Sequence, residues 1–348
     1  MRLYRLKLRP NSAWRTPWQA DTLTGALCSV AARVHGAEFL RRKLIEPMLV
    51  GLPPFVLSDA CPGHLLPLPV TVRLFDPPEA TDRKTLKRGR WISKNHFLAL
   101  RANMINGHVP WQQIRSDDDV FCEQATRHNT LARDSNASLE EAGLFSRQQT
   151  LLRTKVPEES KASAAAQPRS TLKDNPALNG ADYLSLYFRA ADRQAADLLL
   201  ELLHELSLIG FGADVATGHG KFEIPADPEP ESDLDDLPPG ADGLIMLSSF
   251  QPAPSDPTDG WWEAFPKFAK LGPDPGVSDV RKHTLIMFRP GACFRTDPAK
   301  PFLGRALPTH SILPADVCAG LLSRGIELIH PAFGLAVPGV LPTAESTP

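Results

Sequence analysis

The sequence predicts an α+β fold made of two small antiparallel sheets, each covered on one face by helices. Both halves of the chain show the order strand, helix, strand, and neither has enough alternating β/α units for a doubly wound parallel sheet. The 348 residues are enough for two domains, and 42% hydrophobic with 22% charged residues is an ordinary globular composition. We therefore expect two ferredoxin-like domains, over residues 1–180 and 181–348.

The first half opens with clear local patterns. Residues 2–9 alternate between apolar and basic side chains, which predicts a half-buried strand. After a connection that reads NSAWRTPWQAD, apolar residues at helical spacing predict a helix from Asp21 or Thr22 to the glycine at position 36. A second short helix is expected over 38–45, ended by Pro47, and PPFVLSDACPG at 53–63 predicts a short strand.

Residues 62–180 have weaker patterns. A proline-punctuated extended segment at 65–74 precedes a basic stretch at 81–90, and residues 91–100 have helical character. Residues 155–179 are rich in Ser, Ala, Lys and Pro, a composition typical of mobile segments. We expect residues 80–180 to form a long inserted arm followed by a linker.

Regular patterns return at residue 182. Alternation over 182–190 predicts a strand, and six apolar residues on one face of 191–206 predict a helix. Further strands are expected at 221–224, at 243–250 and at 284–294, the last interrupted by Pro290. An acidic spacer at 225–240 and an apolar tail at 325–337 complete the second half.

A glycine-rich loop, GFGADVATGHGKFE at 210–223, joins the 191–206 helix to the next strand. Its four glycines can adopt positive φ and bring backbone amides close to a ligand, and Lys221 adds a positive charge. The spacing matches neither a phosphate-binding P-loop nor the dinucleotide fingerprint, because Val215 breaks both patterns. Two interpretations remain open at this point: a phosphate-handling turn, or a flexible hairpin connection.

Composition excludes several classes of protein. The sequence has no run of about 18 apolar residues, so we expect no membrane span. The first residues alternate rather than forming an apolar signal core. Five scattered cysteines without a C-x-x-C pair indicate free thiols in a reducing cytosol, and no His/Cys/Asp spacing fits a metal site. The net charge of −2 excludes a uniformly basic nucleic-acid binder, although basic residues gather near 2–15 and 83–101, in contrast to an acidic run at 227–236.

Several segments together resemble a known family. They read WRTPWQADTLTGALC (14–28), LPPFVLSDACP (52–62), RWISKNHF (90–97), RHNTLARDSNASLEEAGLF (127–145), the glycine-rich loop and IHPAFGLAVP (329–338). Their order and spacing are similar to the fourth Csm subunit of type III-A CRISPR interference complexes, a RAMP-superfamily protein, over nearly the whole chain. The sequence departs from the family pattern at Ala213, Val215 and Ala216 of the loop and at Leu131-Ala132.

The resemblance implies a non-catalytic, cytoplasmic RNA-binding subunit without cofactor, metal or membrane. It would hold the 5′ repeat-derived tag of the CRISPR RNA, dock the large polymerase-like subunit and the backbone RAMP subunit, and lie near target RNA. The implied fold is two RRM-like domains with a β-hairpin thumb at about 80–180 and the glycine-rich loop in the second domain. The expected RNA-binding residues are Trp14, Arg15, Thr16, Trp18, Gln19, Lys94, Arg127, His128, Asn129, Arg133, Gly210, Gly212, Gly218, His219, Gly220 and Lys221.

Some of these residues have competing interpretations. Trp14 and Trp18 flank Arg15 in a polar connection, which suits base stacking beside a phosphate contact, but the alternative is packing in the core. An alternative function is a metal-independent CRISPR RNA endonuclease, since some RAMP relatives cut RNA by acid–base chemistry. His128 and His219 are the best candidates for it, although no adjacent acid or second histidine completes a catalytic set.

Overall fold

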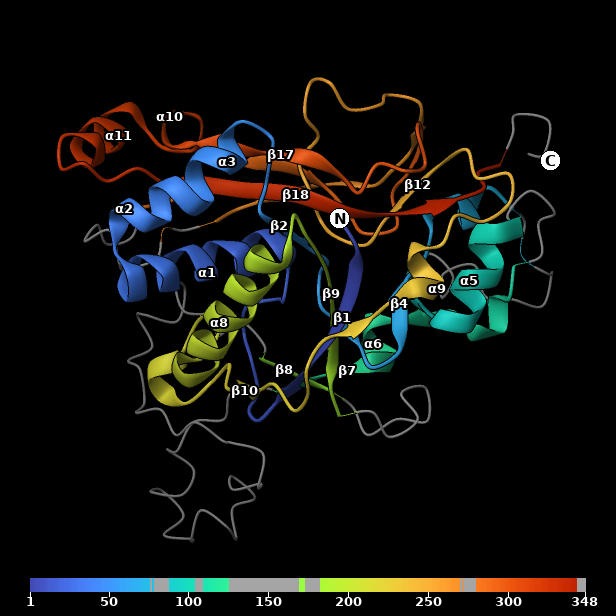
Figure 1. The fold of residues 1–348 in the computed structure, drawn as a ribbon. Coiled ribbons are helices and arrows are strands. Elements are labelled where there is room, and N and C mark those ends of the chain that lie inside the picture. The colour runs from blue at the N-terminus through green and yellow to red at the C-terminus, as the bar shows by residue number, and fades with distance from the viewer. Residues whose placement is uncertain are drawn as a thin grey trace, which may run out of the picture.

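The computed structural model describes residues 1–75, 77, 88–103, 109–124, 169–172, 182–269, 271 and 280–342 (Figure 1). Most of the predicted arm lies outside the described residues, including Arg127, His128, Asn129 and Arg133. None of the described helices is long and apolar enough to cross a membrane. The described chain is a mixture of helices and several antiparallel sheets, in agreement with the α+β class that the sequence predicts.

The elements of the first half are β1 (Leu3–Pro10), α1 (Ala20–His35), α2 (Ala37–Leu40), the π turn η1 (Arg41–Ile45), α3 (Glu46–Leu49), β2 (Phe55–Leu57), β3 (Cys61–Pro62), β4 (Leu65–Pro67), η2 (Val70–Leu74), β5 (Gly89–Ser93), α5 (Lys94–Asn103), η4 (Trp111–Gln113), β6 (Arg115–Ser116), α6 (Asp117–Val120), β7 (Phe121–Gln124) and β8 (Arg169–Leu172). Those of the second half are β9 (Leu184–Ala190), α8 (Arg193–Ile209), η7 (Val215–Thr217), β10 (Phe222–Glu223), β11 (Glu229–Pro230), α9 (Ser232–Asp235), β12 (Gly243–Met246), β13 (Gly260–Trp261), β14 (Ala264–Lys267), β15 (Leu285–Phe288), β16 (Cys293–Arg295), β17 (Phe302–Pro308), α10 (Thr309–Ile312), α11 (Ala315–Leu322) and β18 (Ile329–Gly339).

The first sheet has the strand order β10-β1-β9-β2, and all of its strand pairs are antiparallel. Strand β1 forms where the sequence alternates, and its residues Leu3, Leu6 and Leu8 are fully buried. Helices α1 and α8 pack against each other and lie on one side of this sheet (Figure 1). In chain order, β1-α1-β2 and β9-α8-β10 follow the β-α-β-β-α-β pattern of a ferredoxin-like fold.

The helices of this layer begin and end where local chemistry favours it. The carboxylate of Asp192 accepts a hydrogen bond from the Ala195 N–H at 2.8 Å and caps α8, which ends at Gly210 with φ of 102°. The prediction that the second helix ends at Pro47 is wrong, because the chain continues through η1 into α3. Pro47 stands in the first turn of α3, where a missing N–H is tolerated.

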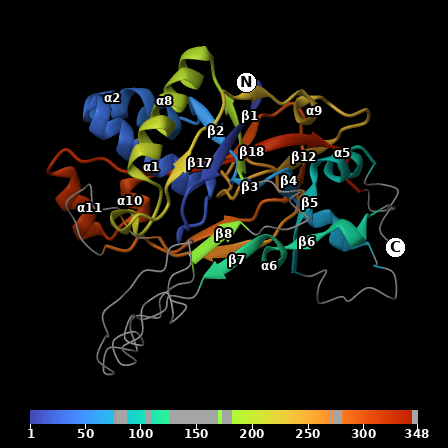
Figure 2. The same cartoon turned by 90° about the horizontal axis from the view of Figure 1, so that it is seen from below.

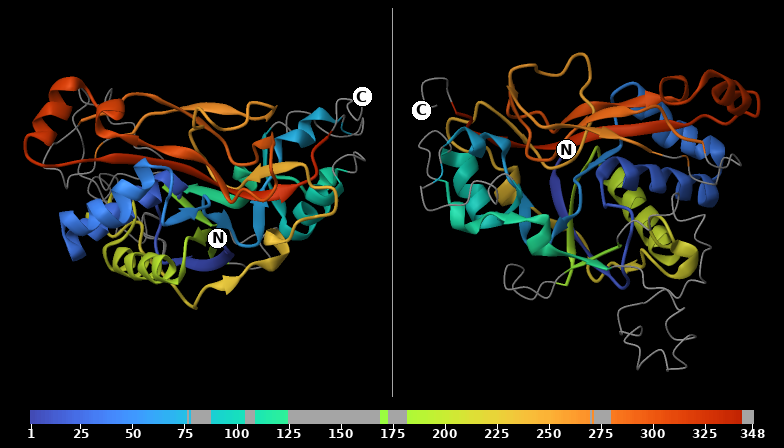
Figure 3. Two further views of the ribbon diagram at one scale, coloured as in Figure 1. Left: turned by 45° about the horizontal axis from the view of Figure 1, so that its top comes forward. Right: turned by 180° about the vertical axis from the view of Figure 1, so that it is seen from behind.

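The second sheet has the order β13-β16-β12-β18-β17. Its longest pairing is the β17–β18 hairpin, from Phe302–Leu335 to Pro308–Ile329. Strand β18 crosses the molecule above α1 (Figures 1 and 3). Its residues from His330 to Gly339 are all buried, because one face meets the first layer and the other packs within its own sheet.

The division predicted at residue 180 does not coincide with a boundary between sheets. Strands β9 and β10 follow residue 180, yet both pair with β1. The glycine-rich loop therefore belongs to the first sheet, because it connects α8 to β10. We propose a division near residue 240, between the two sheets. In the described part of the second sheet, α10 and α11 both follow β17 and precede β18 in the chain. The second sheet therefore does not repeat the strand and helix order of the first sheet.

Smaller elements lie beside the first sheet (Figure 2). They are a three-stranded sheet of order β4-β5-β6 and the antiparallel β7–β8 pair. The acidic spacer is ordered on the outside of β1: β11 pairs with β1, and α9 follows it.

Candidate nucleic-acid interface

Backbone geometry explains the glycines of the 210–223 loop. The glycines with positive φ in this loop are Gly210 (102°), Gly212 (90°), Gly218 (86°) and Gly220 (67°). A Cβ at Gly220 would lie 2.0 Å from the Phe211 carbonyl oxygen, and one at Gly212 would lie 2.5 Å from Thr16 Cβ. At these two positions glycine is required because the chain passes very close to itself.

The loop is hydrogen-bonded to the connection between β1 and α1. The Gly220 N–H donates to the Ala13 carbonyl at 3.0 Å, and the Ala213 N–H donates to Thr16 Oγ1 at 2.9 Å. Two further bonds are those of the Lys221 N–H to Ser12 Oγ and of the Phe211 N–H to the Gly220 carbonyl. These four amides have acceptors within the protein and do not face a ligand in the described conformation. The phosphate clamp at the four glycines stays a prediction.

Lys221 binds the helix that precedes the loop. Its Nζ lies 2.9 Å from the carbonyl oxygens of both Leu208 and Ile209, the last two residues of α8. A cation in this place satisfies carbonyls that have no partner within the helix. The structure therefore gives Lys221 a capping role. His219, also in the loop, is 1% exposed, so its side chain is enclosed by protein.

Trp14 and Trp18 are core residues, with exposed fractions of 4% and 5%. The Trp18 ring centroid lies 4.6 Å from that of Phe211 and 5.2 Å from that of Phe222, so Trp18 anchors the glycine-rich loop. Trp14 meets Trp18 edge to face at 6.3 Å. The core-packing interpretation applies to both rings, and the expected base stacking would require them to leave these contacts.

The other expected residues of the connection contact neighbouring segments. Arg15 Nη1 lies 3.4 Å from the carboxylate of Asp214, and the Arg15 side chain is 26% exposed. The Gln19 side-chain oxygen accepts a hydrogen bond from Lys267 Nζ at 2.8 Å. The connection is thus held between the loop and β14.

Lys94 is paired within the protein. Its Nζ lies 2.5 Å from Glu231 and 3.0 Å from Asp233, both in the acidic spacer. The basic stretch and the acidic run, which lie far apart in the sequence, therefore neutralise each other in part. Lys94 is consequently a poor candidate for a phosphate contact.

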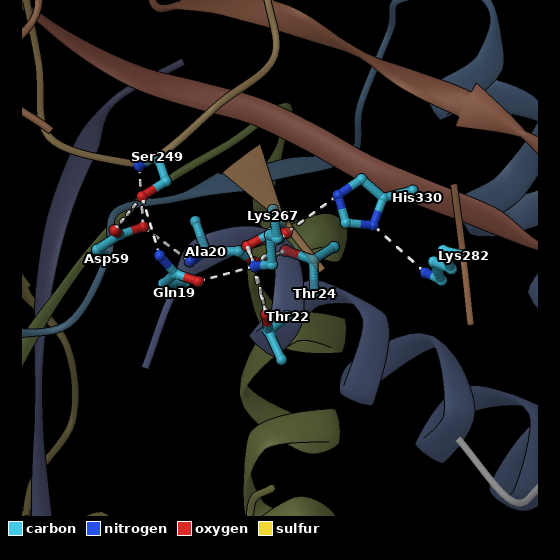
Figure 4. Close-up of polar contacts among 10 residues, drawn as sticks. Gln19, Ala20, Thr22, Thr24, Asp59, Ser249, Lys267, Lys282 and His330 are labelled. Carbon is cyan, nitrogen blue, oxygen red and sulfur yellow. Dashed lines mark hydrogen bonds and ion pairs between the residues drawn. The ribbon is translucent and has the colours of Figure 1, made fainter. Parts of the chain in front are cut away.

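A buried polar network lies where α1 meets the second sheet (Figure 4). Asp21, in the first turn of α1, lies 2.6 Å from Lys267 Nζ and 3.0 Å from His330 Nε2. Lys282 Nζ lies 3.3 Å from His330 Nδ1. A neutral imidazole fits both contacts, donating from Nε2 and accepting at Nδ1, and burial lowers the pKa of His330 accordingly.

Asp59 completes the network from the 53–63 segment. One of its oxygens accepts hydrogen bonds from the N–H groups of Ala20 at 2.9 Å and Ser249 at 3.0 Å, and the other accepts from Ser249 Oγ at 2.7 Å. Burial raises the pKa of Asp59 to about 6. Three segments that carry the family resemblance, around Asp21, Asp59 and His330, therefore meet in one structural network.

A cavity of about 400 Å³ opens beside the connection. Four expected residues line it: Trp14, Arg15, Trp18 and Gln19. Sequence reasoning did not assign a role to the other charged and aromatic residues of its wall, which include Arg73, Arg90, Trp91, Phe121, Glu263 and Arg289. The run RGRWIS at 88–93 mixes basic and aromatic residues and could have indicated part of this wall. No local signal marks Arg73 or Arg289.

Within the described residues, no group of three or more His, Cys, Asp or Glu side chains is arranged to hold a metal ion. The cavity wall combines aromatic rings and arginines with the carboxylates of Asp59, Asp117, Asp118 and Glu263. The aromatic rings and the arginines suit a nucleic acid or a nucleotide.

The chain has a Csm4-like fold along nearly its whole length. It matches a crystal structure of a Csm1–Csm4 cassette in complex with cA3, with a TM-score of 0.54 and 16% identity, over 99% of this chain and 100% of that chain. A second match, to the cassette in complex with cA4, has a TM-score of 0.55 and 14% identity, over 98% and 100%.

A third match is to a Csm3–Csm4 subcomplex of the type III-A CRISPR-Cas interference complex, with a TM-score of 0.53 and 14% identity, over 97% of this chain and 99% of that chain. Csm4 is the protein that these structures have in common. No family model and no curated protein matches the sequence. The fold therefore agrees with the resemblance drawn from the sequence motifs.

Proposed function

We propose that this chain is a non-catalytic RNA-binding subunit of a type III-A CRISPR effector complex, in which it holds the 5′ repeat-derived tag of the CRISPR RNA. The observation that carries the proposal is the likeness in fold to Csm4-containing structures over 99% of the chain. The cavity supports it, because single-stranded RNA is bound by aromatic side chains and by arginines.

The proposal includes two protein partners, the polymerase-like large subunit and the backbone RAMP subunit. Similar chains were crystallised with Csm1 and with Csm3. Exposed apolar side chains near the β14–β15 pair are consistent with a partner surface: Trp262 is 40% exposed, Phe268 73% and Ile286 54%.

The alternative function, RNA cleavage, finds less support in the described residues. His219 is 1% exposed and does not reach a position where it could meet an RNA 2′-hydroxyl without rearrangement of the loop. His128 lies outside the described residues. We therefore keep the non-catalytic role.

The test is a titration of labelled repeat-tag RNA and of a scrambled RNA, in EDTA, with the chain alone and assembled with both partners. The assembled complex is expected to bind the tag RNA more tightly and to leave it intact. Absence of any RNA binding in both preparations would refute the proposal. A discrete cleavage product that disappears in His128→Ala would instead favour the endonuclease.

A further inference from the structure

The cavity beside residues 14–19 has an aromatic wall. The ring centroid of Phe121 lies 6.2 Å from that of Trp14 and 6.3 Å from that of Trp91, and both pairs meet edge to face. Trp14 is fixed in the core, whereas Trp91 is only partly buried, with its Nε1 donating to Asp117 at 2.7 Å. Trp91 therefore presents a partly exposed ring on which a base can stack.

The cavity wall also carries three arginines around one carboxylate. Arg73 forms an ion pair with Glu263, while Arg90 Nη1 lies 3.4 Å and Arg289 Nε 3.8 Å from Glu263 Oε2. The backbone places them together, because the Arg289 N–H donates to the Glu263 carbonyl at 2.9 Å beside the β14–β15 pair. Exposed fractions of 33%, 32% and 43% show that the side chains of Arg73, Arg90 and Arg289 reach solvent.

The other charges of the cavity wall have contacts of their own, and the charge of Asp117 also acts on Arg90. Arg15 pairs with Asp214, and the carboxylate of Asp59 is buried among its own hydrogen bonds. Asp117 and Asp118 lie at the Trp91 end, where Asp117 accepts from the Trp91 indole. Among the described ion pairs, Glu263 is the carboxylate that contacts all three arginines. Burial and the neighbouring guanidinium groups lower the pKa of Arg73, as expected where cations repel one another.

We propose that this cavity holds one unstacked nucleotide, with its base against Trp91 and its phosphate between Arg73, Arg90 and Arg289, in competition with Glu263. This inference rests on the proposed function and locates where the RNA is gripped. The volume of about 400 Å³ lies within the roughly 300–1,000 Å³ of small-ligand sites. Planar guanidinium groups suit bidentate binding of phosphate, and Glu263 keeps them in position until a phosphate displaces it.

The experiment uses four variants of the cavity and two controls on the exposed surface of α8. Arg289→Gln is expected to weaken binding of repeat-tag RNA about tenfold and to flatten the slope of log affinity against log salt by about 0.7. Glu263→Gln, which removes the competitor, is expected to raise affinity about three- to tenfold and to steepen that slope. Arg193→Gln and Glu201→Gln make the same charge changes on α8 and should have little effect.

Tryptophan fluorescence measures whether an RNA base stacks on Trp91. Quenching on RNA binding is expected in the wild type and should be reduced in Trp91→Phe. Arg289→Lys separates charge from geometry: it should retain the salt slope but not the full affinity, and thermal melts of every variant establish that each is folded. A parallel titration with adenosine monophosphate shows whether a free nucleotide occupies the site as well as RNA does.

The outcomes separate this inference from the proposed function. If RNA binds but neither Arg289→Gln nor Glu263→Gln changes its affinity, and Trp91 is not quenched, the nucleotide site is elsewhere and the proposed function stands. If no RNA binds to the chain or to its assembled complex, both are refuted. Quenching of Trp91 by adenosine monophosphate at an affinity equal to that of RNA would confirm a nucleotide site and assign it to a free nucleotide.

Discussion

At the scale of single residues, Asp21 is a buried charge held by two partners. The residue is 2% exposed, and its carboxylate lies within 3.0 Å of both Lys267 Nζ and His330 Nε2. Burial alone would raise its pKa, but the hydrogen bond to His330 and the charge of Lys267 outweigh burial and hold the pKa well below its usual range. Asp21 is therefore a buried, ionised tie between α1 and the second sheet.

Asp21→Asn should be strongly destabilising, because it leaves Lys267 buried without a charged partner. Breaking a buried ion pair on one side costs about 3–5 kcal/mol. Urea unfolding at neutral pH measures the loss. The matched control is Asp197→Asn on α8, whose carboxylate is 68% exposed and whose removal should cost less than about 1 kcal/mol. Equal effects of the two substitutions would contradict the role of the network.

The pKa of Asp59 is raised, whereas that of Asp21 is lowered, so Asp59 predicts a stability that decreases with rising pH. Since burial raises its pKa from 3.8 to about 6, the folded chain retains a proton that the unfolded chain has released between about pH 4 and pH 6. Its contribution to stability therefore falls as pH rises through this window. Asp59→Asn should gain stability relative to the wild type by about 2 kcal/mol from pH 4 to pH 6, at 1.36 kcal/mol per pKa unit. If the free energies of unfolding of the wild type and of Asp59→Asn change with pH in parallel, the raised pKa of Asp59 is disproved.

At the scale of elements, the glycine-rich loop is a packed connection whose backbone requirements differ from one glycine to the next. Gly220 sits against the Phe211 carbonyl, and its N–H reaches Ala13 in the neighbouring connection. Around Gly218 a Cβ would meet nothing within 4 Å. At some positions of the loop, glycine is required because a side chain would clash with its neighbours. At Gly218 there is room for a side chain, and glycine is favoured only because φ is positive.

The comparison of Gly220→Ala with Gly218→Ala tests this distinction. Gly218→Ala, with φ of 86° and open space, should cost only the strain of a left-handed residue, about 1–2 kcal/mol. Gly220→Ala should cost roughly 3 kcal/mol or more, because the Cβ would lie 2.0 Å from backbone and the chain must shift. Denaturant midpoints of both variants provide the measurement, and a milder effect at position 220 would show that the loop is looser than described.

At the scale of the whole molecule, β18 and the acidic spacer join parts that are distant in the sequence. Arg101 of α5 is 5% exposed and donates to the carbonyls of Leu234 at 2.8 Å, Asp236 at 3.1 Å and Pro338 at 3.3 Å. One guanidinium group thus ties α5, the region of α9 and the end of β18. Its five donors in a planar group suit several carbonyls at once.

Arg101→Met should therefore destabilise the whole chain, by about 3 kcal/mol, since it leaves several buried carbonyls without donors while nearly preserving side-chain volume. Thermal unfolding monitored by circular dichroism is the measurement. Arg88→Met is the control, because the Arg88 side chain is 74% exposed and its loss should change stability by about 0.5 kcal/mol at most. If Arg101→Met and Arg88→Met unfold at the same temperature, the contacts of Arg101 do not stabilise the fold.

Local regularities of the sequence were sufficient for the α+β class, for β1, α1, β9 and α8 near their expected bounds, and for the glycine-rich turn, because periodicity and positive φ depend on neighbouring residues alone. Tertiary structure alone decided that β9 and β10 join β1, that Trp18 is buried, and that Arg73, Arg90 and Arg289 surround Glu263. Those outcomes depend on which strands pair and how the two sheets pack, and no local pattern specifies contacts between residues so far apart in the chain.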